Sequence, residues 1–137
     1  MRSERPFNAR RAVATLASLS DTGKVQFWCV LAHNLTVVVR EFVYDEALTG
    51  SNLAKIRKIN EMLHHVTDCI SPAKRRSTQP WDDVSLLRAL HEDAAAAGLA
   101  EQFGHAVSMA ERSAPSMEDY GEAARAPMRG LSEADKE

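Results

Sequence analysis

The clearest helical signal in the chain is the stretch SNLAKIRKINEMLHHVTDCI, residues 51–70. Five aliphatic side chains recur in it at steps of three, four, three and four: Ile56, Ile59, Leu63, Val66 and Ile70. This spacing places them on one face of an α-helix. Pro72 follows, and proline cannot donate the backbone hydrogen bond of a continuing helix. The pattern therefore predicts an amphipathic helix that ends at about residue 70.

A second helix is predicted just before it, from about Lys24 to Asp45. Its apolar side chains follow the same spacing: Trp28, Leu31, Leu35, Val38 and Phe42. Residues 46–51 are expected to form the turn, with Gly50 as the C-terminal stop signal of this helix and Ser51 or Asn52 as the cap of the next. Because the turn is short, the two helices should form an antiparallel hairpin over residues 24–70.

Two shorter helices are expected over residues 81–112, namely Trp81–Ala97 and Leu99–Arg112, with Gly98 between them. They carry alanine where the hairpin carries larger side chains, so we expect a thinner layer that covers the hairpin. Residues 73–79 should be a polar linker. The fold class predicted is all-α, a small helical bundle.

The chain is expected to divide into three parts. Residues 1–23 are rich in arginine and should form a flexible N-terminal segment, in which residues 9–19 have the pattern of a short helix. Residues 24–112 should form a four-helix core domain. Residues 113–137 are acidic, hold prolines and glycines and few bulky apolar side chains, and should be disordered.

Composition excludes some classes of protein. The net charge of −2 argues against a surface that binds nucleic acid or anionic lipid throughout. The longest apolar run is interrupted by His33 and Asn34, and it is shorter than the ~20 residues of a membrane span. Cys29 and Cys69 lie within the apolar helical patterns, which favours free thiols and a reducing, cytoplasmic setting over a disulfide.

The predicted helix 24–45 is apolar over much of its circumference. Such a helix usually contacts more than one neighbour. We therefore expect the protein to form a homodimer, or to bind another protein, through Trp28, Val30, Val37, Phe42 and Tyr44. The leading hypothesis is a non-enzymatic interaction or regulatory protein that associates through its first two helices.

Polar residues beside these apolar stripes have two interpretations. His33, Asn34, Arg40 and Asn60 are expected to pair across a helix interface and fix its register. The alternative is that they line a small polar pocket.

A metal site is the second hypothesis. Glu61 and His64 form a Glu-x-x-His pair on one helical face, the spacing found in carboxylate-bridged di-iron bundles. The chain holds one such pair, so the site would have to be shared across a dimer, with Glu41 as the bridging ligand. The same spacing also occurs on ordinary solvated helix surfaces.

Contact with nucleic acid is the third hypothesis. Basic residues cluster at the two ends of the helix 51–70 and could touch phosphates: Lys55, Arg57, Lys58, Lys74, Arg75 and Arg76. Alternatively, the acidic segment 77–113 packs near them and cancels their field. The sequence has no Gly-x-Ser-x-Gly motif and no glycine-rich phosphate loop, so we predict no catalytic residue and no cofactor.

Overall fold

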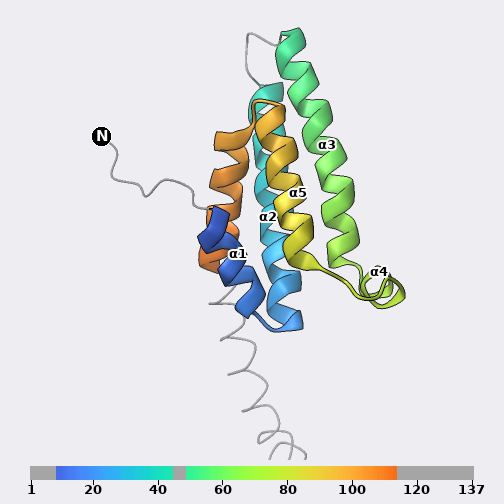
Figure 1. The fold of residues 1–137 in the computed structure, drawn as a ribbon. Helices are drawn as coiled ribbons and strands as arrows, with labels where there is room; N and C mark the ends of the chain where they lie inside the picture. The colour runs from blue at the N-terminus through green and yellow to red at the C-terminus, as the bar shows by residue number, and fades with distance from the viewer. Residues whose placement is uncertain (1–8, 45–48, 114–137) are drawn as a thin grey trace, which may run out of the picture.

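The structure is a computed structural model, and it describes residues 9–44 and 49–113. The described residues are helical apart from short connections, which confirms the all-α bundle (Figure 1). The helices are α1 (Ala9–Ser18), α2 (Asp21–Val43), α3 (Gly50–Ile70), α4 (Pro72–Ser77), α5 (Asp83–Ala96) and a last helix over residues 100–113. No helix in these ranges has both the length and the hydropathy of a membrane span.

The predicted hairpin is present. Helices α2 and α3 lie side by side over most of their length, and the predicted stripe of α2 is buried from Trp28 to Val38. On α3 the most deeply buried residues are Ile59, Met62, Val66 and Cys69. The buried face of α3 is therefore rotated from the predicted stripe, whose members Ile56, Leu63 and Ile70 are half-buried at its edge.

The turn of the hairpin differs in detail from the prediction. Thr49 is the N-cap of α3, and its hydroxyl oxygen accepts a hydrogen bond from the Asn52 backbone N–H at 3.2 Å. Gly50 is the first residue of the helix rather than a stop signal. Residues 45–48 lie outside the described ranges.

The covering helices are α5 and the helix 100–113, as expected. Leu87, Leu90 and Ala94 of α5 are buried, as are Leu99, Phe103, Val107 and Ala110 of the last segment. Gly98 joins them with a φ of 76°. This left-handed conformation is easily adopted only by glycine, which explains why α5 ends here.

The N-terminal prediction is wrong in one respect. Residues 9–18 form α1, and Ala12, Leu16 and Leu19 are buried in the common core. The Arg11 guanidinium pairs with Glu111 of the last helix at 2.7 Å. Helix α1 is thus a fifth component of the core and not part of a flexible leader. Of the predicted tail 113–137, only Ser113 is described, and it belongs to the last helix. Residues 1–8 and 114–137 lie outside the described ranges.

The predicted linker 73–79 is also largely helical. Ser71 ends α3 and caps α4, and its hydroxyl oxygen accepts from the Lys74 backbone N–H at 3.2 Å. Pro72 stands in the first turn of α4, where its missing N–H has no cost. The proline that ends one helix therefore starts another, and α4 projects from the end of the bundle where α2 begins (Figure 1).

Candidate functional site

A buried carboxylate, Asp83, links four segments at the end of the bundle near α4. Its side chain lies in the first turn of α5 and is 7% exposed. Oδ1 accepts a hydrogen bond from Trp28 Nε1 at 2.7 Å and another from Trp81 Nε1 at 3.0 Å. Trp28 belongs to α2 and is fully buried. One oxygen atom thus satisfies both indole N–H groups of the chain.

Arg75 of α4 completes this network. Its Nη1 donates to Asp83 Oδ1 at 2.7 Å, and its Nη2 donates to Asp83 Oδ2 at 3.0 Å. Nη1 also donates to the backbone carbonyl of Cys69 at the end of α3, at 2.9 Å. The guanidinium lies over the Trp81 ring, 5.6 Å from its centroid. The bidentate pair is the strong form of such a contact.

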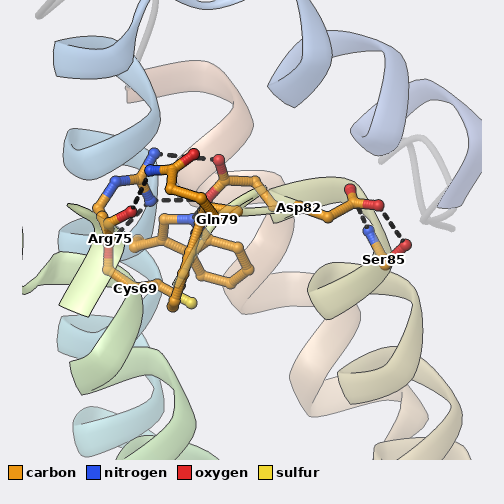
Figure 2. Close-up of polar contacts among 8 residues, drawn as sticks. Cys69, Arg75, Gln79, Asp82 and Ser85 are labelled. Carbon is orange, nitrogen blue, oxygen red and sulfur yellow. Dashed lines mark hydrogen bonds and ion pairs between the residues drawn. The ribbon is translucent and has the colours of Figure 1, made fainter. Parts of the chain in front are cut away.

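Local hydrogen bonds hold the two ends of this network in place. Gln79 Nε2 donates to the Arg75 backbone carbonyl at 2.9 Å, and the two residues lie beside Cys69 in Figure 2. On the other side of that view, the Asp82 carboxylate accepts from the Ser85 backbone N–H at 3.1 Å and from the Ser85 hydroxyl at 2.7 Å. Asp82 is therefore the N-cap of α5, which leaves Asp83 free to turn inward.

The electrostatics of the network follow from burial and pairing. Burial alone would raise the pKa of Asp83, but hydrogen bonds from Arg75 and Trp28 outweigh it and lower the pKa of that carboxyl. Burial, reinforced by the charge of Asp83, raises the pKa of the nearby Cys69 thiol to about 12. Asp83 is therefore an ionised structural link, and its Oδ1 already accepts three hydrogen bonds. Neither it nor Cys69 is in a state suited to attack or to proton abstraction.

A pocket of about 580 Å³ lies beside the network. It is lined by the first two turns of α2, by Ile70 at the end of α3, by α4 and by residues 79–81. Arg75 and Asp83 are part of its lining. Its size is typical of pockets that hold small molecules.

The predicted association surface is only partly available. Trp28 is fully buried and bonded to Asp83, so its assignment to an interface was wrong: an apolar stripe alone does not distinguish core from interface. Val30, Val37 and Phe42 are half-buried, and Tyr44 is 78% exposed. Of the predicted association surface, the most exposed part is therefore the C-terminal end of α2, next to the turn of the hairpin.

The predicted polar residues do not come together. His33, Arg40 and Asn60 are exposed, and Asn34 is half-buried. Asn34 Nδ2 donates to the Val30 carbonyl of its own helix at 2.9 Å, so this amide does not fix a register between helices. None of the four lines the pocket described above.

The basic residues occupy different environments. Lys55 lies 5.9 Å from the centroid of the Phe42 ring, and Lys58 pairs with Glu61 at 3.1 Å. Arg75 is held by Asp83, which is the charge cancellation that the sequence left open as an alternative. Three basic side chains remain exposed: Arg57, Lys74 and Arg76.

The residues of the metal hypothesis are all exposed. Glu61 and His64 lie on α3, and Glu41 lies near the end of α2. Among the described residues, no three histidine, cysteine or acidic side chains gather closely enough to hold a metal ion. A site of the predicted kind would need ligands from a second chain, and it stays a prediction. Cys29 and Cys69 are free thiols.

Comparison with known proteins gave no match to a family model, to a curated protein or to a solved structure. The site therefore has to be interpreted from its own geometry. Sequence reasoning missed the Arg75–Asp83 network because its partners are far apart along the chain: Trp28 and Asp83 are 55 residues apart. One signal was present in the sequence: the basic residues 74–76 are followed within a few positions by Trp81, Asp82 and Asp83.

Proposed function

We propose that this chain is a non-enzymatic interaction protein that forms a homodimer through the end of its α2–α3 hairpin. One observation carries the proposal. The exposed large hydrophobic side chains of the described residues all lie at that end: Val43 at 49%, Tyr44 at 78% and Leu53 at 46%. Single exposed apolar side chains are ordinary, but a group at one end of a bundle is typical of an interaction surface. We call these three residues the hairpin-end patch.

The outer face of α2 extends this patch. Val30, Val37 and Tyr44 are seven residues apart, so they lie along one side of the helix. Val30 still packs partly against the core, whereas Tyr44 is almost fully exposed. The face therefore becomes more available toward the hairpin end, and that is where a partner helix would make most contact.

Charge next to the patch favours a second copy as the partner. Arg40 and Glu41 are adjacent and exposed, and neither forms an ion pair with a residue in the described ranges. In a two-fold contact the same surface meets itself, so an arrangement that sets Arg40 of one copy against Glu41 of the other forms that ion pair twice. A neutral apolar patch with one charge of each sign beside it is thus self-complementary.

The experiment is sedimentation velocity and native mass spectrometry of the full 137-residue chain, over roughly 1–100 µM. We expect a concentration-dependent dimer. Val37→Glu and Tyr44→Glu should weaken it at least about tenfold, because each places two carboxylates in a two-fold interface. Ala89→Glu, at an exposed position on α5 and away from α2, is the matched control and should leave the dimer unchanged.

A charge swap makes the test more specific. Arg40→Glu should weaken the dimer, and the double variant Arg40→Glu/Glu41→Arg should restore it. A chain that stays monomeric over the whole range would overturn the proposal. So would a dimer that Val37→Glu and Tyr44→Glu leave intact.

A further inference from the structure

We propose that the pocket between α2, α4 and residues 79–81 binds a small organic anion with an aromatic or aliphatic body and a single negative charge. The pocket is lined by the start of α2 and by α4, and these segments lie at the opposite end of the bundle from the turn between α2 and α3 (Figure 1). This inference therefore does not depend on dimer formation.

The apolar part of the lining comes from several segments. Val25 is on α2, Ile70 ends α3, Pro72 begins α4, and Pro80 and Trp81 belong to the connection to α5. These side chains are rigid or branched, so little conformational entropy is lost when a ligand packs against them. Apolar walls with a few polar groups are the usual composition of a small-molecule site.

Trp81 is held in place before any ligand arrives. Its Nε1 donates to Asp83, and the Arg75 guanidinium lies over its ring. Arg75 is itself fixed by Asp83 and by the Cys69 carbonyl. The aromatic surface of the pocket is therefore preorganised, which lowers the cost of binding.

The charge of the lining selects the ligand. Arg75 and Asp83 neutralise each other. Lys24 and Arg76 remain as cations, and neither pairs with an acidic group in the described part of the chain. Asp21, in the first turn of α2, is the one other acidic group of the lining. One positive charge is left over, in a chain whose net charge is −2, and this favours a monoanion over a dianion or a cation.

Lys24 is half-buried and Arg76 is exposed. These two cations would contact the anionic group of the ligand, while the body of the ligand packs against Trp81 and its apolar neighbours. An inorganic anion would use only the first of these contacts. A neutral apolar molecule would use only the second. The arrangement therefore fits aromatic carboxylates best.

The test uses 1-naphthoate as the probe and its neutral analogue 1-naphthamide as the control ligand, titrated into the full chain by calorimetry and by two-dimensional NMR at low salt. The chain has two tryptophans. Trp81 lines the pocket, and Trp28 is buried next to it through their shared acceptor Asp83, so the Trp81 indole signal is the direct probe of the pocket. We expect 1-naphthoate to shift the Trp81 signal and to bind at least about fivefold more tightly than the amide. Added salt should reduce that preference.

Variants separate the contributions. Lys24→Gln and Arg76→Gln should each weaken 1-naphthoate binding about fivefold and leave 1-naphthamide binding unchanged. Arg57→Gln removes the same charge from an exposed position on α3 outside the pocket, and should have no effect. Circular dichroism checks that the variants are folded.

Two results would overturn the proposal. The first is that 1-naphthoate and 1-naphthamide bind with equal affinity and that Lys24→Gln and Arg76→Gln change neither affinity. The site would then be an apolar cleft without selectivity for an anion. The second is the absence of any shift in the indole signals with either ligand. Neither result would bear on the dimer, because that is measured at the other end of the molecule.

Discussion

Replacement of Asp83 by alanine should destabilise the protein by about 3–4 kcal/mol. The fully buried Trp28 N–H would lose its acceptor, at a cost of about 1–3 kcal/mol. The Arg75 guanidinium, 12% exposed, would lose its counter-charge, and breaking a buried ion pair costs about 3–5 kcal/mol. These costs do not add in full, because they share one carboxylate and because Arg75 lines a pocket that water can enter.

The assay is urea unfolding at neutral pH, followed by far-ultraviolet circular dichroism. Helix content is the better observable because tryptophan emission would respond directly to the loss of the Asp83 contact. Asp93→Ala, at an exposed position of the same helix, is the matched control and should change the free energy of unfolding by less than about 0.5 kcal/mol.

A double-mutant cycle tests the reasoning itself. Arg75→Ala should cost less in the Asp83→Ala background than in the original chain, by about 1 kcal/mol or more, because the two residues interact directly. A loss of less than about 1 kcal/mol for Asp83→Ala would refute the view that this carboxylate holds the end of the bundle together. Additive effects of the two substitutions would refute the pairing.

Further outcomes follow from burial and titration. Leu16→Ala should cost about 2–5 kcal/mol in urea unfolding because Leu16 is fully buried. Glu92→Ala, at an exposed position of α5, should change the free energy of unfolding by less than about 0.5 kcal/mol. Equal losses for the two variants would contradict the inclusion of α1 in the core. The lowered pKa of Asp83 stabilises the fold above the unfolded value of about 3.9, and this stabilisation is lost as pH falls through the folded pKa. The free energy of unfolding, measured between about pH 5 and pH 2, should therefore fall less on acidification for Asp83→Asn than for the original chain. Parallel plots of the free energy of unfolding against pH for the two proteins would contradict this. Cys69 is fully buried, and its pKa is raised to about 12. It should therefore react with a disulfide reagent more slowly than the half-buried Cys29. The two rates are measured on Cys29→Ser and Cys69→Ser, each of which keeps one thiol, and a faster reaction of Cys69 would contradict the prediction.

Much of the fold could be predicted from local periodicity. The stripe from Trp28 to Phe42 and the pattern Leu99, Phe103, Val107, Ala110 both mark helices with a buried face. Periodicity identifies which side of a helix is buried, but it does not show whether the same chain or a second subunit buries it. That is why Trp28 was assigned to a subunit interface although it lies inside the core.

Other features depend on contacts that are distant along the chain. Helix α1 has two fully buried side chains, Ala12 and Leu16, too few to give a strong pattern within ten residues rich in arginine. Pro72 was correctly expected to end α3, but the same residue suits the first turn of α4. Asp83 lies in the first turn of α5, at the positive end of the helix dipole. Its contact with Trp28, 55 residues away along the chain, is fixed by packing and has no local signature.

The contact between Arg11 and Glu111 has a consequence for folding kinetics. It joins residues 100 positions apart, at the two ends of the described chain. A helix of ten residues is marginal on its own in water, so α1 should acquire hydrogen-exchange protection only when it docks on α5 and the last helix. Contacts of such long range raise the contact order above that of a simple up-and-down bundle. We therefore expect this protein to fold more slowly than helical bundles of its length, and α1 and the last helix to open as one cooperative unit.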